Sequence, residues 1–198
     1  MTPEAGLWNV ANVLTIVRII LVPVFVAFLF AGGTAWRLAA LGTFVVASLT
    51  DLFDGRLARS RGLVTDFGKI ADPVADKALT GAALISLSAL GELPWWVTGL
   101  IMFRELGVTA LRFWVIRWGV IPASRGGKAK TLTQAIAIGF YLLPLTELLD
   151  ADLAVAWVRG VLLGLAVVLT VGTGIDYILR AMRLRAAAPT VAPGSTDA

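Results

Sequence analysis

The sequence predicts an all-α polytopic membrane protein with six transmembrane helices. Hydrophobic residues make up 58% of its 198 positions and charged residues only 15%, whereas about 25% of the residues in a typical soluble domain are charged. The mean hydropathy is +0.85. The apolar runs also recur at about the 20 residues that a helix needs to cross a bilayer core of about 30 Å. They use up most of the chain and leave no room for a separate soluble domain.

The six predicted segments are separated by short stretches rich in turn-forming residues, such as "AGGT" after residue 30 and "GELP" after residue 90. The first apolar run is too long for a signal peptide, carries Arg18 and Pro23, and lacks a convincing cleavage site, so we expect a retained helix. We predict one membrane domain over 1–185. The tail, 186–198, contains proline and few bulky apolar groups, which predicts disorder. The predicted segments are 10–30, 36–59, 73–90, 94–118, 131–149 and 154–182.

The basic residues indicate which side of the membrane each connection occupies. They concentrate between the second and third segments, between the fourth and fifth, and at the end of the sixth. The other connections offer only Arg37 and Arg159, against four acidic residues. By the positive-inside rule, both termini and the charged connections lie in the cytoplasm. We interpret four of these cations as setting orientation only: Arg61, Arg117, Arg183 and Arg185.

Cysteine and histidine are both absent. The absence of cysteine excludes disulfides, thiolate catalysis and cysteine-ligated metals. Without histidine, acid–base chemistry near neutral pH falls to carboxylates or lysines.

The stretch "DLFDGRLARSRGLVTDFGKIADPVADK", residues 51–77, contains five carboxylates and five basic side chains. Asp51 and Asp54 are three residues apart, and Asp72 and Asp76 are four apart, so each pair shares one face of a helix. Two helices could therefore present four carboxylates to one cavity. So much charge at membrane depth needs compensation, and a site with only oxygen ligands suits Mg²⁺ or Mn²⁺.

A simpler interpretation is that these acids pair with nearby cations at the membrane edge, namely Arg56, Arg59 and Lys69. Pairing at the membrane edge does not explain why the two acids of each pair share one face of a helix. Nor does it account for Gly55 and Ala58, which leave a groove of small residues on the face that carries Asp51.

This stretch resembles the signature of the CDP-alcohol phosphatidyltransferases, D-x2-D-G-x2-A-R-x8-G-x3-D-x3-D. The segments "NVLTIVRIILVPVF", "DPVADKALTGAALI", "RELGVTALR" and "PASRGGKAKTLTQAIAI" are similar to the branch of that family that makes phosphatidylglycerophosphate. Every fixed position of the signature is matched: Asp51, Asp54, Gly55, Ala58, Arg59, Gly68, Asp72 and Asp76.

The resemblance implies a six-helix membrane fold, usually dimeric, with an active site open to the cytoplasmic leaflet. The reaction implied is transfer of a phosphatidyl group from CDP-diacylglycerol to an alcohol, with release of CMP. The resemblance also implies that Asp51, Asp54 and Asp72 hold two divalent ions, Mg²⁺ or Mn²⁺. Asp76 completes this metal set and is the base that takes the acceptor's proton.

The same resemblance assigns the CDP-diacylglycerol site. Gly55 and Ala58 would leave room for the cytidine, and Arg59 would meet the nucleotide phosphate. Asp51 and Gly68 complete this set.

A cluster of cations on the cytoplasmic side indicates an acceptor that carries a phosphate. Glycerol 3-phosphate is therefore the expected acceptor. For the two arginines of the fourth segment, the alternative is pairing with Glu105 or reaching toward the interface. The predicted acceptor-phosphate residues are Arg104, Arg112, Arg125, Lys128 and Lys130.

Two kinds of alternative remain open. The same fold could use phosphatidylglycerol, as a cardiolipin synthase does, or inositol phosphate as acceptor. A divalent-cation transporter would also place acids at membrane depth. Nucleic acid is not an expected partner.

Overall fold

The computed structural model describes residues 10–61, 66–116, 125–149 and 151–187. Within these helices, the side chains of 10, 11, 52–61, 66–73, 76, 125 and 187 lie outside the description. The described part is all helical and has no strand, which confirms the predicted all-α class. The helices are α1 (Val10–Ala31), α2 (Thr34–Arg61), α3 (Asp66–Ala89), α4 (Trp95–Val115), α5 (Arg125–Leu142), α6 (Leu145–Leu148) and α7 (Asp152–Ala187).

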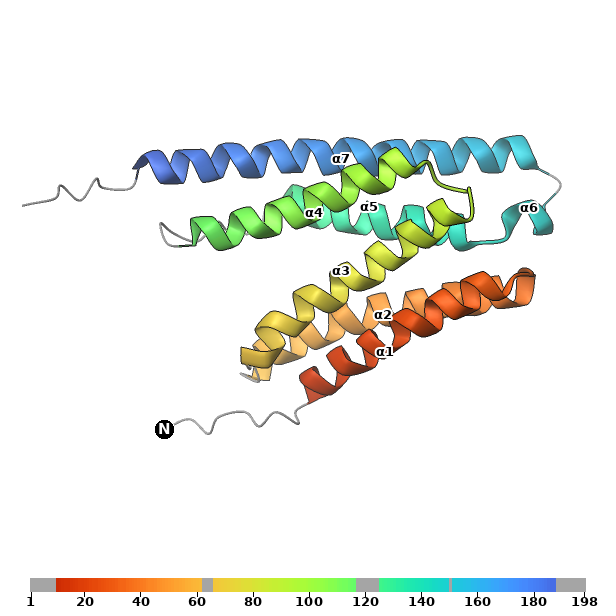
Figure 1. Cartoon of the computed structure of the whole chain (residues 1–198), viewed down its shortest axis with the longest axis horizontal. Helices are drawn as coiled ribbons and strands as arrows, with labels where there is room; N and C mark the ends of the chain where they lie inside the picture. Colours follow the sequence, from red (N-terminus) through yellow and green to blue (C-terminus); the bar gives the residue numbers. More distant parts are fainter. Residues whose placement is uncertain (1–9, 62–65, 117–124, 150, 188–198) are drawn as a thin grey trace, which may run out of the picture.

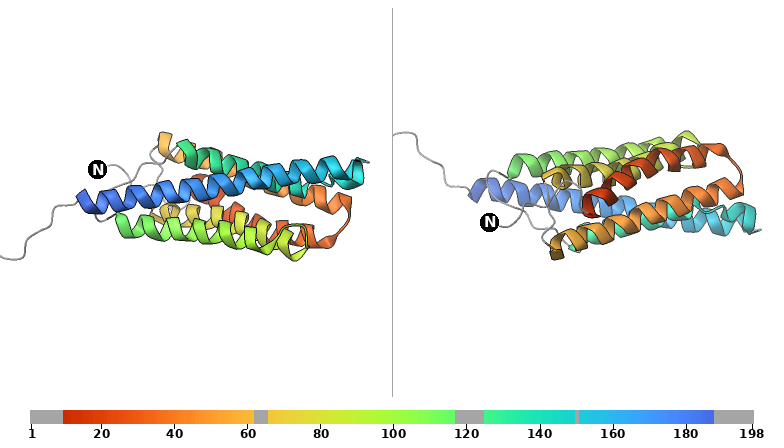
Figure 2. Two further views of the ribbon diagram at one scale, coloured as in Figure 1. Left: turned by 90° about the horizontal axis from the view of Figure 1, so that it is seen from above. Right: turned by 90° about the horizontal axis from the view of Figure 1, so that it is seen from below.

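The six long helices form one elongated bundle (Figure 1). Helices α1 and α2 form a hairpin that α3 joins, while α4 and α5 pack on α7. Figure 2 shows the bundle from two further sides, with α7 running along nearly its whole length. The long helices alternate in direction, so α1 begins and α7 ends at the same end of the bundle. The predicted cytoplasmic ends of α2 to α5 lie at that end too.

The turn between α1 and α2 is made by Gly32 and Gly33, which have φ angles of +76° and +82°. These backbone angles are strained for residues that carry a Cβ atom, and glycine adopts them freely. The chain can therefore reverse within two residues, which lets α2 pack back along α1.

The fifth predicted segment, 131–149, differs from the structure at both ends. Helix α5 already begins at Arg125, ends at Leu142, and is followed by the short helix α6. Pro144 lies at the break, where its ring and its missing N–H prevent a continuous helix. Helix α3 likewise begins at Asp66 rather than at 73, so the second half of the predicted signature is helical.

The end of the bundle away from the signature is closed by Arg37 and Arg159. Arg37 donates to the carbonyl oxygens of Tyr141 (2.7 Å) and Leu142 (3.2 Å), and it also pairs with Glu92. Arg159 donates to the carbonyl of Leu143 at 2.8 Å. The last carbonyls of a helix lack intrahelical partners, so the two arginines cap the end of α5. We conclude that both have a structural role.

Large apolar side chains cover the outside of the bundle as well as its core. Phe103 is 79% exposed, Leu153 74% and Trp157 69%. Soluble monomers rarely show apolar surface on this scale. The outer surface is therefore the kind that a bilayer covers.

By length and composition, two of the described helices could cross a membrane, through Asn12–Ala31 and Asp152–Ala186. Their mean hydropathies are 2.7 and 2.2. Helices α2 to α5 carry the acidic and basic residues of the predicted site, which lowers their hydropathy. The described residues form six long helices, and that all six cross the membrane remains a proposal.

Candidate functional site

The predicted signature spans the last turns of α2 and the first turns of α3, and these two helices contact each other. The backbone places Asp51 and Asp54 on one face of α2, and Asp72 and Asp76 on one face of α3. Among these four carboxylates, the structure describes the side chain of Asp51. Whether all four converge therefore stays a prediction.

Asp51 is held by a cation from α1. Arg18 donates from Nη1 to Oδ1 of Asp51 at 2.5 Å. The Arg18 side chain is fully buried, while that of Asp51 is 38% exposed. A buried guanidinium needs an anion to offset its loss of hydration, and Asp51 supplies it. The pair thus ties α1 to the helix that carries the first predicted metal ligand.

Sequence reasoning used Arg18 only as an argument against a signal peptide and missed this role. A signal was present, because Asn12, Thr15 and Arg18 follow one another at intervals of three residues. All three are buried in the structure, on the face of α1 that packs against its neighbours. Polar residues repeating along one face of an apolar helix indicate a functional interior.

The described side chains contain no group of three acidic residues able to hold a metal ion. The rest of the predicted metal and CDP-diacylglycerol set has side chains outside the described residues, and its assignment stays a prediction. These residues are Asp54, Asp72, Asp76, Gly55, Ala58, Arg59 and Gly68.

A second charged cluster is formed around Glu105 of α4. Its Oε1 accepts from Arg104 at 3.0 Å and also from Lys130 of α5. Its Oε2 lies 3.8 Å from Nζ of Lys77, which belongs to α3. We call these four residues the Glu105 cluster. Three helices thus contribute three cations to one carboxylate.

The Glu105 cluster contains two of the five predicted acceptor-phosphate residues, Arg104 and Lys130. Arg112 lies two turns further along α4, with its guanidinium 5.9 Å from the ring centre of Tyr177. Lys128 has an exposed side chain, and the side chain of Arg125 is outside the description. Each residue of a helix is rotated by about 100° from the one before it, so residues two apart point to nearly opposite sides. This explains why Lys130 is buried and Lys128 is not.

Arg104 is fixed from the other side by α7. Its Nη2 donates to Oγ1 of Thr173 at 2.8 Å. A Cβ atom added to Gly174 would come within 3.2 Å of Cγ of Arg104. This glycine gives the arginine side chain room to lie along α7 and reach Glu105.

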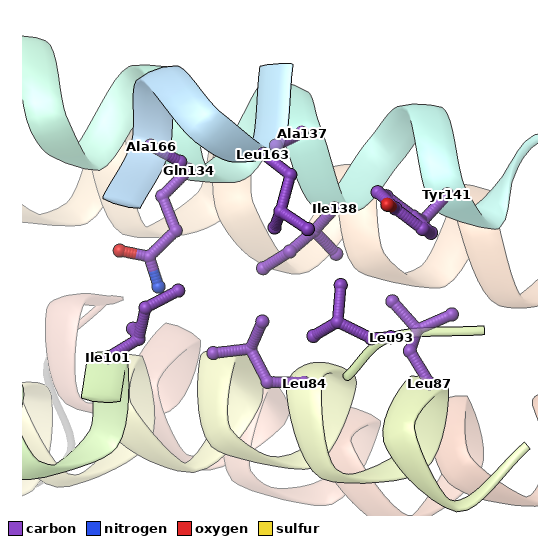
Figure 3. A pocket seen from close by; sticks show the side chains of 10 residues that line it. All are labelled: Leu84, Leu87, Leu93, Ile101, Gln134, Ala137, Ile138, Tyr141, Leu163 and Ala166. Atoms are coloured by element: carbon purple, nitrogen blue, oxygen red, sulfur yellow. The ribbon is translucent and has the colours of Figure 1, made fainter. Parts of the chain in front are cut away.

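One turn from Lys130, toward the middle of the bundle, α5 carries Gln134. Figure 3 shows its amide projecting toward Ile101 into a cavity otherwise lined mainly by aliphatic side chains. The cavity leaves about 10 Å³ for the centre of a water molecule, close to the minimum for holding one. Among the residues that the structure describes, neither the oxygen nor the nitrogen of this buried amide has a hydrogen-bond partner. Gln134 is therefore a buried amide without a hydrogen-bond partner among the described residues, beside an apolar cavity.

The family model described as CDP-alcohol phosphatidyltransferase matches residues 8–172. A protein of Mycobacterium tuberculosis H37Rv named "Probable phosphatidylglycerophosphate synthase" is 55% identical over 183 residues, which cover 91% of this chain and 85% of that protein. A Bacillus subtilis protein named "CDP-diacylglycerol–glycerol-3-phosphate 3-phosphatidyltransferase" is 38% identical over 189 residues, which cover 86% of this chain and 94% of the relative. An Escherichia coli K12 protein of the same name is 38% identical over 141 residues, covering 68% and 77% of the two chains.

Proposed function

Since the chain belongs to the CDP-alcohol phosphatidyltransferase family, we propose that it transfers a phosphatidyl group from CDP-diacylglycerol to sn-glycerol 3-phosphate. The products are phosphatidylglycerophosphate and CMP. The names of the three relatives reported above state this activity or its product, and their matches cover 68–91% of the chain.

The observation that carries the choice of acceptor is the Glu105 cluster. Three of its residues are cations and one is an anion, so its formal net charge is +2. A phosphate monoester carries about −1.5 to −2 charges near pH 7, and arginine and lysine are its usual partners. Acceptors such as serine or choline carry no phosphate and would not need this arrangement.

In the proposed reaction, Asp76 takes the proton of an acceptor hydroxyl. The freed oxygen forms a bond to the phosphorus that carries diacylglycerol, and the bond from that phosphorus to CMP breaks. CMP leaves with the electron pair. A carboxylate base suits a chain without histidine. On α2, Gly55 and Ala58 leave room for the cytidine and Arg59 meets the nucleotide phosphate.

The residues fit a hard divalent cation, because every proposed ligand is a carboxylate: Asp51, Asp54, Asp72 and Asp76. The side chain of Asp51 is 38% exposed, so a bound ion or substrate could reach it. When bound, two Mg²⁺ or Mn²⁺ ions would neutralise charge on the diphosphate and on the departing CMP. Arg18 orients Asp51 and limits the repulsion among the four acids.

We also propose that all six long helices cross the cell membrane, with both termini and the active site in the cytoplasm. The apolar exterior of the bundle and the basic residues at one end support this orientation. Helices α2 to α5 can carry charges at depth because these face other helices or the site. The family resemblance supports a homodimer. We also propose a single domain over 1–185, although α7 continues to Ala187, two residues into the predicted tail.

The experiment is a product assay on the purified protein with Mg²⁺ and CDP-diacylglycerol, given glycerol 3-phosphate, phosphatidylglycerol or inositol phosphate in separate reactions. We expect phosphatidylglycerophosphate from the first and no lipid product from the others. Cardiolipin from phosphatidylglycerol, or a product from inositol phosphate alone, would replace the proposed acceptor. No lipid product at all, with Mn²⁺ uptake into protein-containing vesicles, would favour a transporter.

A further inference from the structure

Glu105 lies where the cations of three helices meet, and its role was not predicted. We propose that Glu105 is the positioning residue that assembles the acceptor-phosphate site, by holding Lys77, Arg104 and Lys130 together before the substrate arrives. This inference rests on the proposed function.

The two carboxylate oxygens of Glu105 contact different cations. Oε1 serves both Arg104, at 3.0 Å, and Lys130, while Oε2 faces Lys77 at 3.8 Å. Arg104 is its neighbour in α4, whereas Lys77 comes from α3 and Lys130 from α5. Within the described residues, the carboxylate of Glu105 therefore bridges cations from three helices.

The burial of these side chains makes the carboxylate necessary. The side chain of Lys130 is 5% exposed, and those of Arg104 and Lys77 are 16% and 21% exposed. Like charges this close repel one another, and more strongly away from water. Without an anion between them, the long side chains would turn toward water at the cytoplasmic end of the bundle. Glu105 keeps them inside while the site is empty.

The net charge that remains suits the substrate. One carboxylate among three cations leaves a formal charge of +2, which a phosphate dianion would neutralise. With a neutral side chain at 105, the formal charge of these four residues would be +3. With a second acid, the site would attract the phosphate less strongly.

Lys77 also connects this cluster to the proposed chemistry. It follows Asp76, the proposed base, directly in α3. Glycerol 3-phosphate has only three carbons, so its phosphate must bind close to the base that acts on its hydroxyl. Neighbouring residues on a helix point about 100° apart, so the adjacency brings the two backbones together, and the approach of both side chains to one substrate is part of the proposal.

The test compares Glu105→Gln and Glu105→Asp with Glu92→Gln. Glu92 is a matched control because it is also paired with an arginine, Arg37, and is 22% exposed where Glu105 is 15% exposed. It lies near the opposite end of the bundle from the signature. All proteins are full-length and purified, and kcat, the two KM values and the melting temperature are measured for each.

For Glu105→Gln we expect the KM for glycerol 3-phosphate to rise about tenfold or more, the size of effect expected when charge-assisted contacts are lost. The KM for CDP-diacylglycerol should stay the same. Glu105→Asp keeps the charge but has a shorter reach, so its KM for glycerol 3-phosphate should lie between wild type and Glu105→Gln. Glu92→Gln should lower the melting temperature and leave both KM values unchanged.

An unchanged or lower KM for glycerol 3-phosphate in Glu105→Gln would overturn the inference, as would equal rises for both substrates. If Glu105→Gln does not fold, Glu105→Asp decides, and a wild-type KM for glycerol 3-phosphate in that variant rejects the positioning role. If wild-type protein makes no phosphatidylglycerophosphate, the proposed function fails and the inference fails with it. If wild type is active but the variants show no selective rise, only the inference fails.

Discussion

Neutralising Lys130 and Lys128 separately should give two very different enzymes, although the lysines are only two residues apart. The side chain of Lys130 is 5% exposed and bonded to Glu105, whereas that of Lys128 is exposed. Lys130→Gln removes a cation from the proposed phosphate site. Lys128→Gln removes one from the surface of α5, so it controls for the change in net charge.

The magnitude follows from the contact that is lost. A hydrogen bond to a charged group contributes about 1.5–3 kcal/mol, and about 1.4 kcal/mol corresponds to a tenfold change in an equilibrium constant. The KM for glycerol 3-phosphate should therefore rise roughly 10- to 150-fold in Lys130→Gln. Folding should suffer less, because Arg104 and Lys77 still face Glu105 in the variant.

The assay measures initial rates of phosphatidylglycerophosphate formation while glycerol 3-phosphate is varied at saturating CDP-diacylglycerol, and then the reverse. We expect a selective rise in the KM for glycerol 3-phosphate in Lys130→Gln and none in Lys128→Gln. Similar rises in both variants would show that burial and contact with Glu105 do not identify the phosphate ligands. Equal rises for both substrates would place Lys130 at the nucleotide instead.

Three further predictions concern the carboxylate side of the site. Arg18→Met should lower activity about tenfold or more, because the hydrogen bond that orients Asp51 is lost, and Arg18→Lys should recover part of that activity. Wild-type activity of Arg18→Met at all Mg²⁺ concentrations would exclude the proposed role of Arg18 in orienting Asp51. Asp76→Asn should lower kcat about 100-fold or more, the usual contribution of a general base, while the purified variant still binds CDP-diacylglycerol. A variant that keeps more than about a tenth of wild-type turnover would reject Asp76 as the base. Exhaustive chelation should abolish activity, and Mg²⁺ or Mn²⁺ should restore it, because the proposed ligands offer only hard oxygen donors; full turnover after chelation would contradict a metal site.

The fold could be predicted because its helices are long and their apolar runs are separated by glycine and proline. The helix ends were harder, and α5 shows why. Pro144 lies inside the predicted run 131–149, and a proline there is a signal for the end of a helix that the predicted boundary overlooked. Its true start at Arg125 lies in a stretch whose glycines and cations are typical of a loop.

The candidate site could be predicted in part, because the signature has fixed spacing along two helices. The Glu105 cluster could not, because its members come from three helices and their convergence depends on how these pack. Arg104 and Lys130 were selected for their charge. Lys77 was only counted among the basic residues of its connection, and Glu105 was considered only as a partner of the two arginines. Helical periodicity alone could have separated Lys128 from Lys130, because they point to nearly opposite sides of α5.

The most direct test of the account is a competition for one donor. Purified protein with Mg²⁺ and CDP-diacylglycerol is given glycerol 3-phosphate and phosphatidylglycerol together at equal concentrations, and the lipid products are separated while released CMP is measured. The account predicts phosphatidylglycerophosphate as the lipid product, in amounts equal to the CMP released. Cardiolipin as the main product, or CMP release without phosphatidylglycerophosphate, would contradict the claim that glycerol 3-phosphate is the acceptor.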